Sequence, residues 1–320
     1  MKKLFFSWLI FFGCSVPVLA ESGLTLVTSP LPINLVAAPG SSVSAEIKIK
    51  NGGKDTEKLK VGLMKFSAYN QDGQPRLFDR EKGDDYFDWV SFSENKFELE
   101  SNEWKTIEMK IEVPDDAAFG YYYAVVFSRD EEYIPDGNKT TKIVGATACL
   151  VLLEVRVDRA IREIEIEEFM ADKKVYEFLP TNFLIKLKNK GNVHVAPRGN
   201  IFITDSKGKD VSVIEVNEFR GNILPQSIRN FETNWTDGFP RYENKKLKWD
   251  FTKINKLRIG KYKASMLLAY DDGKRDVPIE AVLSFWVIPY RIIGGIVVVS
   301  SLILVGLSSL IISIIKIFKK

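Results

Sequence analysis

The residues that most often carry chemistry in proteins are scarce in this chain, which has one histidine and two cysteines in 320 residues. Zinc sites, iron–sulfur clusters and disulfide scaffolds all need more of them. His194 could act as a proton shuttle, but it lies between Val193 and Val195 in an alternating run, and no nucleophile motif accompanies it. We therefore predict a partly exposed histidine on a strand, and a protein that is not an enzyme.

The two cysteines have different surroundings. Cys149 lies in the mostly apolar run 146–153, which predicts an inert core thiol rather than a reactive one. Cys14 lies near the N-terminus, where Lys2 and Lys3 precede an apolar stretch and a small-residue cleavage site ends at Ala20. Residues 1–20 are predicted to be a cleaved secretion signal, and the alternative is a lipoprotein signal with Cys14 as the lipidated residue.

Two acidic clusters could bind calcium, which takes about six to eight oxygen ligands. They are Asp84 and Asp85 with Asp88, and the acidic run 130–132. Neither has the loop spacing of a known calcium motif, so both are predicted to be solvated loops, and we expect no metal site and no cofactor.

Aromatic side chains give the best candidates for a binding surface. Trp89, Tyr121, Tyr122 and Tyr123 could stack against sugar rings. Because successive side chains of a strand point to opposite faces, some of the tyrosines must be buried, and only one or two would remain exposed for a ligand.

The elements that must position these residues are strands. Apolar and polar residues alternate almost throughout the body of the chain, and turn residues such as those at 71–73, 136–138, 206–208 and 271–273 separate the runs. Many short antiparallel strands predict an all-β sandwich fold. The strand candidates are 43–50, 106–113, 122–127, 146–157, 164–166, 183–188, 201–204 and 263–270.

The C-terminal end predicts a membrane span. Residues 292–315 contain no charged side chain, and about 20 apolar residues suffice for a helix to cross a bilayer. Trp286 and Tyr290 would form an interfacial aromatic belt, and the lysines of the 316–320 tail place that tail in the cytoplasm. The protein is thus expected in the cell membrane, single-pass, with its N-terminal domains extracellular.

Without the two ends, the body has 39 basic against 42 acidic residues. A nucleic-acid-binding protein needs a basic face that displaces counterions from phosphate, so this class is excluded.

A weak internal repeat divides the body into two domains. The sequence IKIKNGGK at 47–54 resembles IKLKNKGN at 185–192, and each reads as a strand that runs into an Asn/Gly turn. The predicted domains are 21–158 and 159–287, followed by a juxtamembrane and transmembrane helix at 288–315. The short link predicts a stiff rod.

The first domain resembles the N-terminal domain of the bacterial WxL-interacting proteins. The resemblance lies in the segments PGSSVSAEIKIKNGG, WVSFSENKFELESNEWKTIEMKIEVP and PDDAAFGYYYAVVF, and the second domain, with IKLKNKGNVHVAPRGNIFITDSKGK and IGKYKASMLLAY, is similar to the sandwich that follows in related proteins. The resemblance implies two immunoglobulin-like domains and a C-terminal membrane anchor. It also implies that the first domain binds peptidoglycan and the second a surface protein, and it assigns no functional residue.

Two function classes follow from these features. The first is a membrane-anchored cell-surface binding or scaffold protein that engages the cell wall and a surface protein partner. The alternative is a chaperone-like sandwich that binds client proteins by edge-strand pairing. Gly120 is expected to be structural, because a residue without Cβ permits a tight entry into the aromatic strand that follows it.

Overall fold

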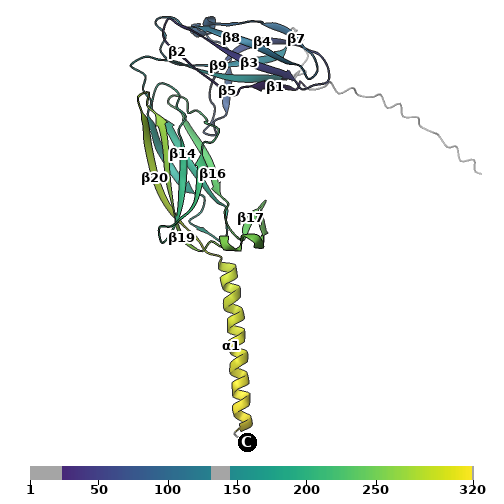
Figure 1. Cartoon of the computed structure of the whole chain (residues 1–320), viewed down its shortest axis with the longest axis vertical. Helices are drawn as coiled ribbons and strands as arrows, with labels where there is room; N and C mark the ends of the chain where they lie inside the picture. Colours follow the sequence, from purple (N-terminus) through teal and green to yellow (C-terminus); the bar gives the residue numbers. More distant parts are fainter. Residues whose placement is uncertain (1–23, 131–144, 319–320) are drawn as a thin grey trace, which may run out of the picture.

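The computed structural model describes residues 24–130 and 145–318. The predicted secretion signal with Cys14, the turn at 136–138 and most of the second acidic cluster lie outside these residues. Within them, each predicted strand overlaps an observed strand, although several observed strands are longer than predicted, β11 by five residues at its C-terminal end. The chain forms two tandem immunoglobulin-like β-sandwiches followed by one long helix, as predicted (Figure 1).

The first sandwich, here called domain 1, packs two sheets against each other. One sheet has the order β1-β3-β8-β6, and the other has the order β2-β10-β9-β4-β5, with β7 also paired to β4. Its elements are β1 (Leu26–Ser29), β2 (Ile33–Ala37), β3 (Ser42–Asn51), β4 (Glu57–Ala68), β5 (Pro75–Phe78), the short helix η1 (Asp85–Trp89), β6 (Val90–Phe92), β7 (Lys96–Leu99), β8 (Trp104–Glu112), β9 (Phe119–Arg129) and β10 (Ala146–Val155).

The second sandwich, domain 2, repeats this plan with sheets β11-β13-β16 and β12-β20-β19-β14-β15, beside a separate β17-β18 hairpin. The predicted domain boundary falls in the link 156–163. The elements are β11 (Ile164–Ala171), β12 (Val175–Tyr176), β13 (Thr181–Asn189), β14 (Arg198–Asp205), β15 (Asp210–Val216), β16 (Ile228–Trp235), β17 (Arg241–Glu243), β18 (Lys246–Lys248), the short helix η2 (Phe251–Lys256), β19 (Gly260–Asp271) and β20 (Asp276–Val287).

In both domains the N-terminal part of the chain changes sheets. β1 pairs with β3 in one sheet, and after three residues β2 pairs in parallel with β10 in the other sheet. Likewise β11 pairs with β13, and β12 then pairs in parallel with β20. The second and last strands of each domain are therefore neighbours.

The internal repeat is confirmed in its hydrogen bonds. Asn51 and Asn189 are both fully buried, and each accepts a bond at Oδ1 from the backbone N–H two residues later, at 2.8 Å. Each also donates through Nδ2 to two backbone carbonyls, one of them four residues later. A buried amide must satisfy its donors and acceptor, so the same residue builds the same turn in both domains.

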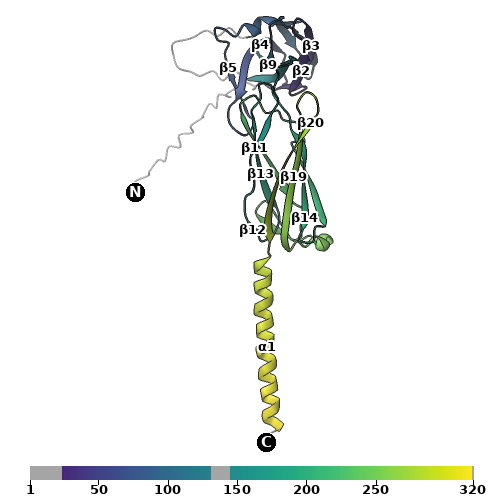
Figure 2. The same cartoon turned by 90° about the vertical axis from the view of Figure 1, so that its left-hand side faces the viewer.

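The two domains are not aligned end to end, and the predicted stiffness of the link between them stays a prediction. Domain 1 lies across the end of domain 2 that is far from the C-terminal helix, and the chain bends where they meet (Figures 1 and 2). The bend is stabilised by contacts across the link rather than by the link's length alone, since Arg162 forms an ion pair with Glu154 of β10.

The C-terminal helix α1 (Tyr290–Phe318) follows β20 after two residues and extends away from the sandwiches (Figure 2). Its segment Tyr290–Ile312 has a mean hydropathy of 2.6, and none of it is buried against the rest of the protein. A helix that is apolar all round and unburied has the length and composition of a membrane span.

Candidate functional site: the cleft between the two domains

The four aromatic residues singled out from the sequence do not form one surface. Tyr123 is fully buried in the core of domain 1, and its hydroxyl donates to the backbone oxygen of Tyr86 at 3.1 Å. Tyr121 packs edge-on against Trp89 at 4.6 Å, at the partly buried margin of the same core. Tyr122 points the other way, as strand alternation requires. Tyr123 is therefore a core residue, and a ligand role for Trp89 and Tyr121 stays a prediction.

His194 does not lie on a strand, which corrects the sequence prediction. It lies in the loop before the bridge at Val195, where its ring meets Tyr122 of domain 1 at 5.8 Å. Burial, together with the nearby charge of Arg162, lowers the pKa of His194 to about 4. The imidazole is thus neutral at physiological pH and contributes to the contact between the domains.

Cys149 lies in the core of domain 1, and the acidic residues Asp84 and Asp88 form ion pairs with basic side chains. Cys149 is fully buried, and burial raises the pKa of its thiol to about 12, which suits an inert core thiol. Asp88 pairs with Arg80 at 2.5 Å, and Asp84 pairs with Lys65 at 3.2 Å. No group of three or more metal-binding side chains occurs in the described residues.

The outer face of the β4-β9-β10 sheet, away from the core of domain 1, carries a second apolar cluster. Phe66 and Leu152 are 8% and 3% exposed, although they lie outside that core. The other members of this face are the partly buried Met64, Leu77, Tyr122, Val126, Ala148 and Leu150, and Leu224 of domain 2 packs on them. A sheet with two apolar faces needs a cover on both, and domain 2 supplies part of the second cover.

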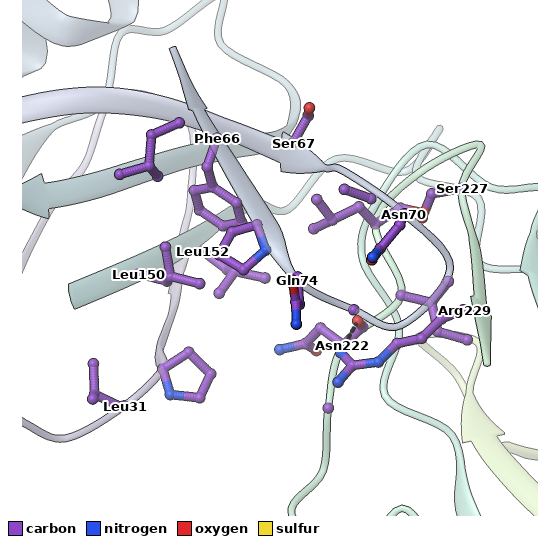
Figure 3. Close-up of a pocket in the computed structure, with 18 of the residues that line it drawn as sticks. Leu31, Phe66, Ser67, Asn70, Gln74, Leu150, Leu152, Asn222, Ser227 and Arg229 are labelled. Atoms are coloured by element: carbon purple, nitrogen blue, oxygen red, sulfur yellow. Dashed lines mark hydrogen bonds between the residues drawn. The ribbon is translucent and has the colours of Figure 1, made fainter. Parts of the chain in front are cut away.

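Loops of domain 2 close a cavity of about 540 Å³ over this face. Figure 3 shows Phe66, Leu150 and Leu152 on one side of it and Asn222 and Arg229 on the other. The cavity is mostly apolar, which suits a hydrophobic segment of a partner rather than a charged ligand.

Polar contacts hold these loops in place. Asn222 donates to the side chain of Asn34 at 2.9 Å, and the backbone N–H of Asn230 donates to the carbonyl of Gln71 at 2.5 Å. Arg229 donates to the carbonyl of Asn222 at 2.7 Å, and burial lowers the pKa of its guanidinium. The domain 2 side of the cavity is thus ordered by hydrogen bonds rather than by apolar packing alone.

An incompletely paired strand lies at the edge of this cavity. β10 pairs with β9 from Ala146 to Val155, but it pairs with β2 only from Val151 onward. Among the described residues, 146–150 therefore have a strand on one side only. These five residues include neither proline nor a charged side chain, and Ala148 and Leu150 also line the cavity. A sheet edge of this kind can accept a strand from another chain.

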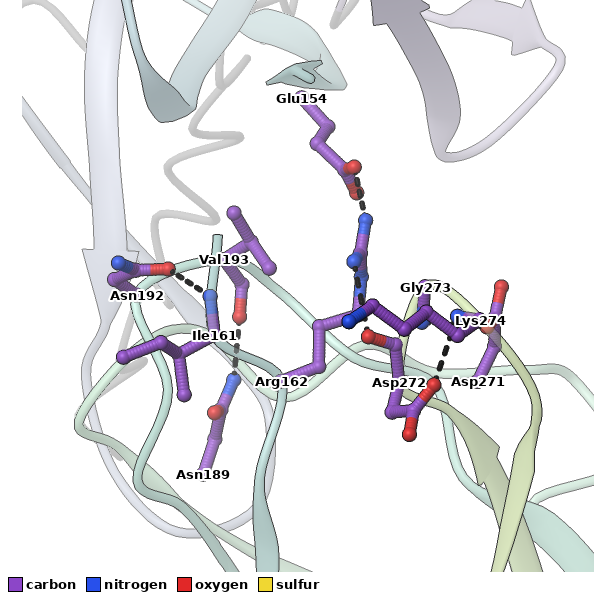
Figure 4. Close-up of polar contacts among 10 residues, drawn as sticks. All are labelled: Glu154, Ile161, Arg162, Asn189, Asn192, Val193, Asp271, Asp272, Gly273 and Lys274. Atoms are coloured by element: carbon purple, nitrogen blue, oxygen red, sulfur yellow. Dashed lines mark hydrogen bonds and ion pairs between the residues drawn. The ribbon is translucent and has the colours of Figure 1, made fainter. Parts of the chain in front are cut away.

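A second, polar cleft of about 420 Å³ lies on the other side of the link. Arg162 donates to the carbonyl of Asp272 at 3.5 Å and pairs with Glu154, so one side chain joins β10, the link and the β19–β20 turn (Figure 4). This cleft connects the domains through charge, whereas the first connects them through apolar surface.

A continuous apolar run in the sequence of β10 indicates the apolar outer face, which the search for alternating residues missed. The run at 150–153 is Leu-Val-Leu-Leu, without polar residues between the apolar ones, which is typical of a strand buried on both faces. Such a run indicates a covered strand but does not indicate what covers it.

Comparisons with known proteins do not assign the chain to a family. No family model matches it, and no curated protein matches it. Similar solved structures include the class 5 fimbriae chaperone CfaA, with 14% identity and a TM-score of 0.38 over 81% of this chain and 98% of that chain. The E. coli chaperone DraB gives 11% identity and a TM-score of 0.35, covering 81% of this chain and 98% of that chain. Because these similarities are so low, the function has to be derived from the geometry of the chain itself.

Proposed function

We propose that this protein is a membrane-anchored binding module that receives an extended segment of a client protein along β10. The observation that carries the proposal is the half-paired β10, residues 146–150, beside the apolar cavity. Main-chain hydrogen bonds to this edge would supply affinity, and pockets for alternate side chains would supply specificity. The chaperone-like alternative from the sequence is thus favoured over the wall-binding scaffold.

The dimensions of the site define the client segment. Five residues of strand span about 17 Å at 3.3–3.4 Å per residue. Alternate side chains of the client would face the cavity next to Ala148 and Leu150, so they should be apolar. We infer a client segment of about five residues with apolar side chains at every second position.

The test places a photo-crosslinking amino acid at Thr147 in the full chain in its native membrane. We expect adducts that map to an alternating apolar segment of the client, and protection of the 146–150 amides from hydrogen exchange when that segment is added as a peptide. Ala148→Asp should weaken the peptide at least about tenfold, because it puts a charge on the apolar face.

The matched control is Val282→Asp on β20, whose side chain is 58% exposed and lies on the equivalent strand of domain 2. It should leave peptide binding unchanged. Equal losses from both variants, or unprotected 146–150 amides in the complex, would refute pairing along β10.

The wall-binding scaffold remains the second candidate, favoured by the Trp89–Tyr121 pair at the partly exposed margin of domain 1. We propose to mix the full chain with purified sacculi. Retention that is lost in Trp89→Ala would support peptidoglycan binding, whereas hydrolysis of the sacculi would contradict a non-enzymatic role.

The proposed orientation puts residues 21–290 outside the cytoplasm and the lysine-rich tail inside. Protease added to intact spheroplasts should digest nearly all of the chain. Survival of the sandwiches together with loss of a C-terminal tag would mean the opposite orientation and would remove the client from reach.

A further inference from the structure

Domain 2 exposes a cluster of apolar side chains at its helix-proximal end, which neither the client site nor the core uses. We call it the apolar patch, and it comprises Trp249, Phe251, Ile254, Leu257 and Ile259. Phe251 and Ile254 are 68% and 61% exposed, and η2 contains no buried residue. A short helix that buries none of its apolar side chains within its own protein needs an external partner for them.

The patch is held in an ordered arrangement. Trp249 and Phe251 stack at 6.2 Å, and both contact the buried Phe239, at 5.8 and 5.5 Å. Asp250 caps η2 by accepting a hydrogen bond from the backbone N–H of Thr252. η2 is kinked at Lys253, between Phe251 and Ile254, and it ends at Leu257, whose backbone is extended.

The β17-β18 hairpin that precedes the patch is linked to the start of α1 through Glu177. The carboxylate of Glu177 accepts a hydrogen bond from the hydroxyl of Tyr242 in β17 at 3.2 Å, and it lies 3.6 Å from Arg291 in the first turn of α1. Figures 1 and 2 show the hairpin and η2 at the end of domain 2 from which α1 emerges. Trp286, near the end of β20, and Tyr290, the first residue of α1, are 45% and 55% exposed.

The segment around the patch is strongly basic. Residues 241–261 contain eight basic and two acidic side chains. Glu243 pairs with Lys248 at 2.8 Å, and Asp237 pairs with Lys256 and Arg258 at 2.8 and 2.9 Å. The exposed Lys245, Lys246 and Lys253 have no ion pair among the described residues. Exposed aromatic and aliphatic side chains with lysines beside them match the interface of an anionic bilayer.

We propose that the apolar patch inserts into the interfacial layer of the membrane that α1 spans, with its lysines over anionic lipid headgroups. The patch then gives domain 2 a second attachment beside the helix, and the two attachments fix the tilt of the sandwich on the membrane. This inference rests on α1 being the membrane anchor, and it is independent of client binding.

The test attaches a nitroxide at Thr252→Cys in the full chain, with Cys14→Ser, in nanodiscs of phosphatidylcholine and phosphatidylglycerol. Cys149 is buried and should not react, which the unmodified parent verifies. Accessibility to oxygen, which partitions into lipid, is compared with accessibility to a water-soluble nickel chelate. We expect high oxygen and low nickel accessibility at position 252, and the reverse for a label at Lys82→Cys, in an exposed loop of domain 1.

Two variants distinguish lipid contact from a local effect. Phe251→Ser with Ile254→Ser should return the 252 label to water, whereas the equally polar change Trp104→Ser, at a 51% exposed tryptophan of domain 1, should not. Raising the phosphatidylglycerol fraction should move the 252 label deeper into the bilayer, with higher oxygen and lower nickel accessibility. In the double variant Lys245→Gln with Lys253→Gln, the depth of the label should no longer depend on the phosphatidylglycerol fraction. A 252 label as open to nickel as the Lys82 label would overturn the proposal. Low accessibility to both reagents would also overturn it, in favour of a protein partner or a second copy.

Discussion

The last strands of the two domains occupy the same place in the same fold, yet their edges differ. β10 and β20 each pair with an antiparallel neighbour along their length and with a short parallel strand at their C-terminal end. The remaining edge of β20 carries Asp276, Pro278 and Glu280, whereas residues 146–150 of β10 carry none of these types. Proline and charge on an edge strand prevent pairing with other chains. Among the described residues, the unpaired edge of β20 thus carries proline and charge, whereas the unpaired edge of β10 carries neither, and its Ala148 and Leu150 line the cavity.

The largest effect should come from the feature that the two domains share. Asn51→Ala and Asn189→Ala each remove three buried hydrogen bonds, so each should lower the free energy of unfolding by about 2–4 kcal/mol. Thermal melting of the solubilised chain would measure both. The exposed Asn95→Ala serves as the control and should change stability by less than about 0.5 kcal/mol. A large cost in only one domain would show that the repeated turns are not equivalent.

A smaller effect should separate two glycines that begin equivalent strands. Gly260 has φ +119, whereas a Cβ on Gly120 would collide with the hydroxyl of Tyr122. Gly120→Val and Gly260→Val should each cost about 1–3 kcal/mol, the first through a clash and the second through backbone strain. Tyr122→Phe should reduce the cost at Gly120, while Tyr262→Phe should leave the cost at Gly260 unchanged. An unchanged melting temperature for Gly120→Val would make that glycine an ordinary surface residue.

The smallest effect on stability should come from the contact between the two domains, where His194 of domain 2 packs against Tyr122 of domain 1. The folded pKa of His194 is about 4, against an ordinary 6.5, so the unfolded chain binds a proton that the folded chain does not between these values. The stabilisation is complete above pH 6.5 and is lost as the pH falls toward 4, and the loss reaches about 1–2 kcal/mol between about pH 5.5 and pH 5. His194→Gln should flatten this part of the stability-versus-pH curve. An identical slope in the variant would mean that His194 is solvated rather than packed on Tyr122.

The strands and the repeated turn could be predicted because they are local. Alternation at 43–50 and 183–188 fixes which side chains face the core, and Asn51 and Asn189 recur at the strand ends where a buried amide is needed. These features depend on residues a few positions apart, so one sequence is sufficient to see them.

The cleft could not be predicted because it depends on where distant segments meet. The open half of β10 exists only because β2 joins the sheet at Val151, more than a hundred residues after β2 in the chain. Gly120 shows the same limit at short range. The sequence predicted a tight backbone entry at Gly120, but the positive φ belongs to Phe119, at 71°, and Gly120 is required by the ring of Tyr122. That ring packs against His194 of domain 2, a contact between distant segments that no local pattern encodes.

The parallel pairing of the second and last strands of each domain also has a mechanical consequence. A pull on domain 1 away from the membrane reaches domain 2 through β11 and β12 and leaves it through β20 and α1, so the parallel pair slides in shear and its hydrogen bonds carry the load together. In domain 1 the corresponding pair has five register positions, Ile33 to Ala37, whereas β12 has two, Val175 and Tyr176. Rupture under force is governed by the unfolding rate rather than by equilibrium stability. Under tension, we expect domain 2 to unfold before domain 1, because fewer hydrogen bonds join its parallel pair of strands.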